Sequence, residues 1–247
     1  MGSDSAPDAP PLRGARRILP VLLPLLAVDL ALIAVYVALA AGPGRAPDLW
    51  NIGLEYSVSE VFNLGKWAAT AALLAHLGLG RARPGLAPLA VIYLILLADD
   101  GLQLHETAGS WLTGALAGGP WATAAQDLGE LAAWAVLGVA ILVLYRRAWR
   151  RASGPDRAWV AALFGAFLGL LFCGIGLDML HSALGDGSWI VAGFLSVAED
   201  GGEMLFASLT LALASGAAGD PRAGRRDRAA AGRTREAPLP RGALPRK

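Results

Sequence analysis

The sequence predicts an all-α integral membrane protein, a polytopic bundle of about six transmembrane helices. Hydrophobic residues make up 55% of the 247 residues and charged residues only 17%. The apolar residues gather in segments close to the roughly 20 residues that a helix needs to cross the hydrocarbon core. Pro, Gly, Arg and Trp separate these segments, as is typical where a chain leaves a bilayer.

Six segments of suitable length divide the chain. We expect helices at residues 18–41, 56–79, 86–105, 128–146, 158–181 and 189–215, which together form a transmembrane domain over residues 13–217. The apolar part of the first segment is too long for a secretory signal, whose apolar region spans roughly 7–15 residues. Residues 1–12 and 218–247 contain few large apolar side chains, so both are predicted to be disordered tails.

The basic residues predict the orientation. Nineteen of the 21 Lys and Arg residues fall on one side of the predicted bundle, and only Arg45 and Lys66 do not. The positive-inside rule therefore places both termini in the cytoplasm, and we expect a bacterial plasma membrane. The basic tail 218–247 is expected to contact anionic lipid, and no motif favours nucleic acid.

Acidic residues and two histidines gather on the other, outer side. Five predicted helices carry them: Glu60, Asp99, Asp100, His105, Glu106, Glu130, Asp178, His181, Glu199, Asp200 and Glu203. Such residues at membrane depth cost a few kcal/mol each and mark functional sites by default. Glu55, Glu106 and Asp127 lie at helix ends, where headgroups or water could satisfy them. Glu199 begins about 15 Å into its helix, too deep for that.

The spacing of these residues favours a metal site. Asp178 and His181 are three residues apart and Glu199 and Glu203 four apart, so each pair shares a helix face. With His105 they form a nitrogen and oxygen ligand set that suits zinc, iron or manganese. Cys173 is the only cysteine, which excludes an internal disulfide and a cysteine-based metal site.

A metal there would support hydrolysis of a lipid or lipid-linked substrate. Glu106 or Glu130 would act as general base on a metal-bound water. If the helix 86–105 runs on, Asp99, Gln103 and Glu106 form one stripe and His105 points about 100° away from it.

Three other interpretations of the acidic cluster stay open. It could be the coupling site of a proton- or cation-coupled transporter with Lys66 as a gate, although no internal repeat and no clearly broken helix pair is evident. It could be a hydrogen-bonded network that only fixes helix packing. The chain could also be an assembly subunit whose basic tail meets a partner.

Two stripes and one loop have interpretations of their own. Ser59, Asn63 and Lys66 share a narrow helix face, and Lys66 near the bilayer midplane needs a counter-ion, either Asp29 or Asp200. The small residues Gly165, Gly169 and Cys173 allow close helix approach, within the bundle or between protomers of a homo-oligomer. The loop 107–126, with Trp111 and Trp121, is expected to lie at the outer interface as a lid.

Two short motifs carry a resemblance. Asp99-Asp100-x4-His105-Glu106 closes one helix, and Glu199-Asp200-x2-Glu203 lies in a later one. This resembles uncharacterised bacterial multipass membrane proteins in which an S-x-D-E-x4-H-E-like segment closes one helix and an E-E-x2-E-like segment opens another. Here Asp100 stands where Glu is more usual, and Leu97 stands in place of the Ser. The resemblance implies a site and brings no activity with it.

Overall fold

The computed structural model describes residues 10–42, 46–80, 83–116, 119, 124–184 and 189–220, and its elements are helical, which confirms the all-α class. The helices are α1 (Pro10–Ala40), α2 (Val58–Gly80), α3 (Ala87–Gly101), α4 (Leu104–Ala115), α5 (Ala125–Arg151), α6 (Gly154–Leu171), α7 (Asp178–Leu184) and α8 (Trp189–Ala218). A 3-10 turn, η1 (Asp48–Trp50), precedes α2. A π-helical segment, η2 (Phe172–Leu177), joins α6 to α7.

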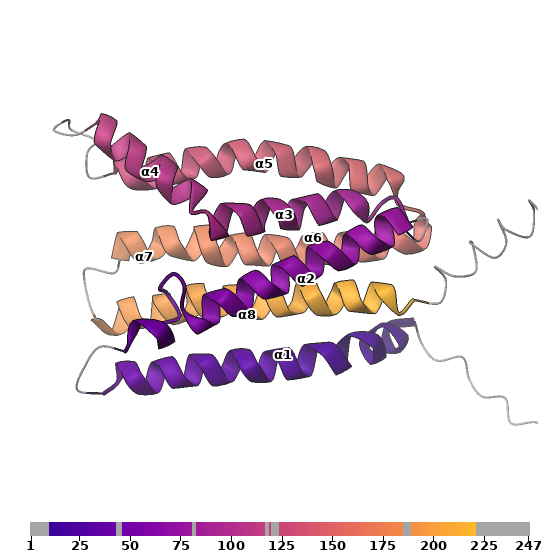
Figure 1. The fold of residues 1–247 in the computed structure, drawn as a ribbon, viewed down its shortest axis with the longest axis horizontal. Helices are drawn as coiled ribbons and strands as arrows, with labels where there is room; N and C mark the ends of the chain where they lie inside the picture. Colours follow the sequence, from indigo (N-terminus) through magenta and orange to yellow (C-terminus); the bar gives the residue numbers. More distant parts are fainter. Residues whose placement is uncertain are drawn as a thin grey trace, which may run out of the picture.

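The long helices run side by side along the long axis of the molecule, and α8 lies between α1 and α6 (Figure 1). Helices α1, α2 and α6 pack against α8, α3 packs against α2, and α5 packs against α3 and α4. In the most apolar part of α8 56% of the residues are buried, against 6% in α1 and 11% in α5. The apolar side chains of α1 and α5 therefore point mainly outward, as expected of helices that contact lipid.

Four helical stretches in the described residues are long and apolar enough to cross a membrane: Arg16–Ala40, Ala125–Arg151, Gly154–His181 and Gly193–Ala218. Helices α3 and α4 pass the same test together, bent by 50°, and would make a fifth span. Helix α2 has 23 residues but carries Asn63, Lys66 and His76, which lower its hydropathy. The six predicted segments all form helices, while the count of six spans stays a prediction.

Several boundaries differ from those that the sequence predicts. Helix α3 ends at Gly101 instead of continuing to residue 105, and α4 occupies much of the segment expected to be a loop. Helix α1 begins at Pro10, inside the predicted tail 1–12. Residues 1–9 and 221–247 lie outside the described residues, as do Arg45 and Trp121, and with them the expected contact of the basic tail with lipid.

The apolar core lies toward the arginine-bearing end of the bundle. It is built from fully buried residues such as Leu74, Leu89 and Phe167. Tyr93 donates a hydrogen bond from its hydroxyl to the Leu163 carbonyl (3.2 Å). Arg83, which is 3% exposed, donates to the Asp156 carboxylate at 2.6 and 2.9 Å and to a carbonyl of α8. These contacts close this end, and the polar residues collect at the other.

Candidate functional site

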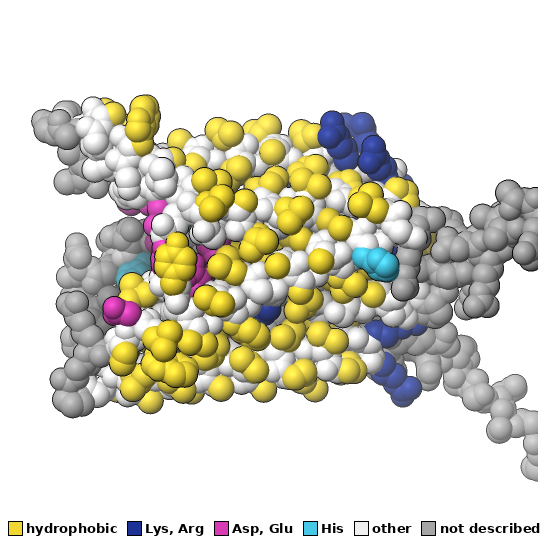
Figure 2. All heavy atoms as spheres, in the orientation of Figure 1, with side chains coloured by type: hydrophobic (Ala, Val, Ile, Leu, Met, Phe, Trp, Pro, Cys, Tyr) yellow, Lys and Arg dark blue, Asp and Glu magenta, His cyan; other side chains and the backbone are white. Residues whose placement is uncertain are grey.

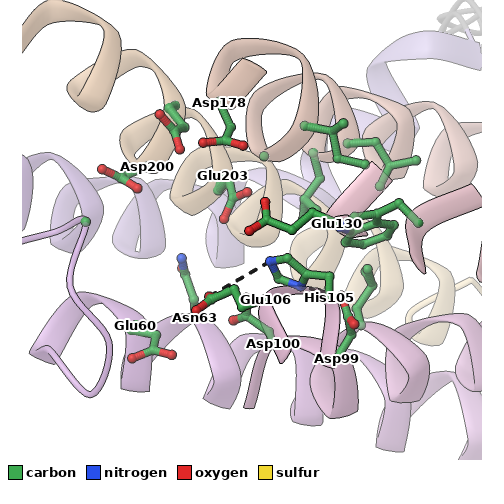
Figure 3. A pocket seen from close by; sticks show the side chains of 18 of the residues that line it. Glu60, Asn63, Asp99, Asp100, His105, Glu106, Glu130, Asp178, Asp200 and Glu203 are labelled. Atoms are coloured by element: carbon green, nitrogen blue, oxygen red, sulfur yellow. Dashed lines mark hydrogen bonds and ion pairs between the residues drawn. The ribbon is translucent and has the colours of Figure 1, made fainter. Parts of the chain in front are cut away.

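The acidic residues line one cavity of about 340 Å³. It lies at the end of the bundle opposite the arginines, where the Asp and Glu side chains show between the helices (Figure 2). Helices α2 to α8 all contribute to its wall, together with η2 and the loop before α2. Of the residues predicted for the site, the cavity brings together Glu60, Asp99, Asp100, His105, Glu106, Glu130, Asp178, Glu199, Asp200 and Glu203 (Figure 3).

The break between α3 and α4 forms one corner of the cavity. Gln103 adopts the left-handed conformation (φ 52°), and the chain turns by 50° before α4 begins. The turn brings His105 back toward α3, so its Nδ1 lies 3.0 Å from Asp99 Oδ2. The predicted stripe of Asp99, Gln103 and Glu106 on one straight helix is therefore wrong. A helix that continued would have pointed Asp99 and His105 well apart.

The π-helical segment η2 forms the opposite wall. Gly174 lies within it, and a Cβ at this position would collide with the Glu203 carboxylate, so glycine is what lets Glu203 lie against the backbone. The segment ends at Leu177, and the next residue, Asp178, lines the cavity. Single π turns inside helices often mark functional sites because they shift side chains out of the regular repeat.

The spacing of Asp178 and His181 predicted that both line the site, but His181 does not line the cavity. Its Nδ1 lies 3.1 Å from Glu199 Oε2, and its side chain is 31% exposed. The two histidines thus form separate pairs with carboxylates, one at the α3–α4 corner and one between α7 and α8.

Helix α8 supplies the deepest carboxylates. Asp200 accepts a hydrogen bond from Ser196 Oγ (3.0 Å), and Glu203 follows one turn deeper. On the far side Gln126 donates from Nε2 to the Glu130 carboxylate (2.5 Å). These amide and hydroxyl groups hold the carboxylates in place without neutralising them.

The loop before α2 adds a group that sequence reasoning assigned only to a helix end. Glu55 is partly buried and contacts the Glu106 carboxyl group. Burial first, then this contact and the repulsion of Glu106, Glu60 and Asp100, raise the pKa of Glu55 to about 7. Asp127 lines the cavity as well. Only the depth of neighbouring carboxylates on other helices could have distinguished these two residues from ordinary interfacial ones.

Lys66 lies outside the cavity lining, in a fully buried network. Its Nζ donates to Asp29 Oδ1 (2.9 Å), to the Met204 carbonyl (2.9 Å) and to Ser208 Oγ (3.2 Å). Ser208 in turn donates to the second oxygen of Asp29 (2.5 Å). Of the two expected counter-ions, Asp29 is the one in contact, and the network ties α1, α2 and α8 together.

The predicted metal ligands do not converge on one point. In the parts of the chain that the structure describes, no three His, Cys, Asp or Glu side chains are arranged to hold one metal ion. His105, Asp178, His181, Glu199 and Glu203 are instead divided between the cavity wall and the two histidine–carboxylate pairs. A metal centre stays a prediction.

The charge balance of the cavity is its main chemical property. Eleven of the described residues that line it are Asp or Glu, out of 20 in the chain, and none is Lys or Arg. Carboxylates this crowded repel one another and cannot all be ionised without partners. Such a cavity can hold protons, and it can exchange them for bound cations.

Comparison with known proteins adds a family. A family model, described as a domain of unknown function (DUF8692), matches residues 20–216. No curated protein and no solved structure matches the chain. The matched region runs from α1 to the end of α8 and contains the whole cavity. The chain belongs to the DUF8692 family.

Proposed function

We propose that this protein is a cation- or proton-coupled transporter of the bacterial plasma membrane, with the acidic cavity as its outward-facing coupling site. The observation that carries the proposal is the crowding of eleven carboxyl groups around a cavity with no lining Lys or Arg. A cation that enters would displace protons, which couples the binding of one ion to the release of another.

The breaks in the helices support transport. Many transporters build their ion sites from discontinuous helices near the middle of the bundle. The sequence gives no clear sign of a broken helix, but the described residues contain two: the 50° bend between α3 and α4 and the π-helical segment Phe172–Leu177. Both flank the cavity, where a change in either break would move carboxylates.

Flux through liposomes tests the proposal. Protein is reconstituted with a pH-sensitive dye inside the vesicles, and inward gradients of sodium, potassium and magnesium are imposed in turn. We expect one of them to change the internal pH, and Asp200→Asn and Glu203→Gln each to reduce the initial rate at least tenfold. Asp48→Asn removes an exposed carboxylate outside the cavity and serves as control. No proton movement with any of the three cations would contradict coupled transport.

Metal-dependent hydrolysis of a lipid-type substrate is the second candidate. It is favoured by the two histidines, each held at Nδ1 by a carboxylate, as metal-ligating histidines commonly are. Elemental analysis by mass spectrometry of the purified protein, beside His105→Ala and His181→Ala, tests it. Near-stoichiometric zinc, iron or manganese that both variants lose would favour this candidate over transport of a simple cation.

A further inference from the structure

The floor of the acidic cavity carries polar atoms that have no partner within the protein. Among the buried side-chain nitrogen and oxygen atoms that the structure describes, three lack a hydrogen bond: Asn63 Oδ1, Trp67 Nε1 and Asp99 Oδ1. Their residues are 7%, 2% and 1% exposed, and all three line the cavity. A buried polar atom without a partner costs about 1–3 kcal/mol. All three atoms belong to residues that line the same cavity, which indicates a lining that a ligand completes.

Local structure fixes these three groups. Asn63 and Trp67 are four residues apart on α2 and therefore share a helix face. Asp99 is held through its other oxygen by His105, which leaves Oδ1 for another partner. Figure 3 shows the Asn63 side chain extending into the cavity, toward the side of Asp200 and Glu203.

The three atoms differ in what they require. The oxygens of Asn63 and Asp99 accept hydrogen bonds, whereas the indole N–H of Trp67 only donates. A bare metal ion could contact the two oxygens but would repel the N–H. A ligand that satisfies all three carries N–H or O–H donors and, separately, an oxygen acceptor.

The cavity wall adds charge and size. Its carboxylates favour a cation and would repel a ligand that also carries a carboxylate or phosphate. A volume of about 340 Å³ lies at the lower end of the range of small-molecule pockets. The lining also includes Trp67 and Trp134, and indole faces attract organic cations.

We propose that the cavity binds a protonated amino alcohol, with its ammonium group at Asn63 and Asp99 and its hydroxyl oxygen accepting from Trp67. This inference rests on the cation-binding part of the proposed function. The ligand could be a soluble molecule or the head of a long-chain amino alcohol in the membrane, since both carry the same two groups.

Calorimetric titration of the detergent-purified protein with matched probes tests the proposal. Ethanolamine carries both groups, ethylamine lacks the hydroxyl, and choline lacks the N–H donors. We expect ethanolamine to bind about tenfold more tightly than ethylamine. Pairing a buried N–H that otherwise lacks a partner is worth about 1–3 kcal/mol, and about 1.4 kcal/mol is a factor of ten in affinity. Choline should bind more weakly than ethanolamine. A tighter complex with 2-aminododecan-1-ol than with ethanolamine would identify the lipid source, and equal affinities the soluble one.

Trp67→Phe isolates the hydrogen bond that defines the ligand class. The variant keeps an aromatic ring but removes the N–H, so ethanolamine should lose its tenfold advantage while the affinity for ethylamine stays unchanged. Asn63→Leu should weaken both amines. A general loss of folding would lower both affinities in Trp67→Phe and would also lower the Tm without ligand, so the selective loss is diagnostic.

The outcomes separate this inference from the proposed function. Equal affinity for ethanolamine and ethylamine in the wild type, or no binding of either, would overturn the amino-alcohol inference. If inorganic cations still drive proton flux in liposomes, coupled transport stands without it. Amine binding that depends on Trp67, in a protein that moves no protons, would support the ligand class and contradict coupled transport.

Discussion

Lys66 and Asp29 form an ion pair that is closed off from both water and lipid. Lys66 is 2% exposed and Asp29 0%. The attraction within such a pair roughly offsets the cost of removing two charges from water, so it contributes little net stability, but removal of one partner leaves a buried charge uncompensated. Neither residue of the pair can therefore be replaced alone without a loss of stability.

The Lys66–Asp29 pair predicts a large loss of stability in a single variant and its recovery in a double variant. Asp29→Asn should destabilise the bundle by about 3–5 kcal/mol, a fall in Tm of roughly 10 °C for a chain of this size. The double variant Asp29→Asn with Lys66→Met removes both charges and should recover most of that loss. Thermal unfolding in detergent measures both. A double variant as unstable as the single one would show that the hydrogen bonds, and not the charge pair, hold the three helices.

Glu55 predicts a pH dependence of stability. The pKa of Glu55 is about 7 in the folded chain, above its ordinary value of 4.5. Between pH 4.5 and pH 7 the folded chain therefore holds this proton more tightly than the unfolded chain does. Stability is therefore lost as the pH rises from about 4.5 through about 7. Glu55→Gln removes this penalty and should raise the Tm by about 2–4 °C at pH 8 and hardly at all at pH 4.5, because solvent screens a partly exposed group.

A matched control for Glu55 comes from the same segment of the chain. Asp48→Asn removes an exposed carboxylate outside the cavity and should leave the pH profile of the Tm unchanged. If Glu55→Gln raises the Tm equally at pH 4.5 and pH 8, the ionisation of Glu55 is not the cause, and the packing of its side chain is.

At the level of residues, the sequence predicted the membership of the cavity better than its contacts. Depth and sidedness follow from the helix repeat and the distribution of arginines, so Glu199, Asp200 and Glu203 could be assigned to one layer. The pairing of His105 with Asp99 could not be predicted, because it depends on a left-handed residue, Gln103, that has no sequence signal such as Gly or Asn.

At the level of elements, the small-residue stripe on α6 divides into two unlike positions. A Cβ at Gly169 would meet the ring of Phe206 on α8, whereas a Cβ at Gly165 would find no atom within 4 Å. Cys173 completes the close approach, since its Sγ lies 2.5 Å from the place of a Cβ on Gly202. The predicted packing within the bundle is therefore confirmed for Gly169 and Cys173 but not for Gly165.

The two glycines make a matched pair of substitutions. Gly169→Ala should destabilise the protein by about 1–3 kcal/mol, since a methyl group has to displace the Phe206 ring. Gly165→Ala should be neutral or stabilise by up to about 1 kcal/mol, because alanine favours a helix more than glycine does. Thermal unfolding distinguishes them. Phe206→Leu should relieve much of the loss in Gly169→Ala, and an equal loss in both alanine variants would contradict the close approach of α6 and α8.

Hydropathy could not predict where the helices are interrupted. The apolar run before Asp99 predicts a helix but says nothing of where it bends. The segment that follows, residues 107–126, was expected to be a loop at the outer interface. In the structure it forms α4, which packs along α5, where Gly109 and Gly129 let the two backbones approach. Tertiary contact therefore decides the α3–α4 corner, and with it the position of His105.

At the level of the whole molecule, charge is segregated between the two ends of the bundle. Lys and Arg side chains gather at one end and the acidic cavity opens toward the other (Figure 2). At the end that carries the arginines, Arg83 donates hydrogen bonds to Asp156 and to a carbonyl of α8. The apolar core and the Arg83 contacts therefore occupy one end of the bundle, and the cavity and the two helix interruptions occupy the other.

This segregation predicts the orientation in the membrane. By the positive-inside rule we expect the basic end to face the cytoplasm and the cavity to face outward. With Cys173→Ala as background, Asp48→Cys should react with a membrane-impermeant maleimide in intact cells. Arg150→Cys, exposed at the end of α5, should react only after permeabilisation. The reverse pattern would turn the cavity toward the cytoplasm, and labelling of both in intact cells would indicate two orientations. With the cavity turned toward the cytoplasm, a cation gradient directed inward from outside would no longer load it.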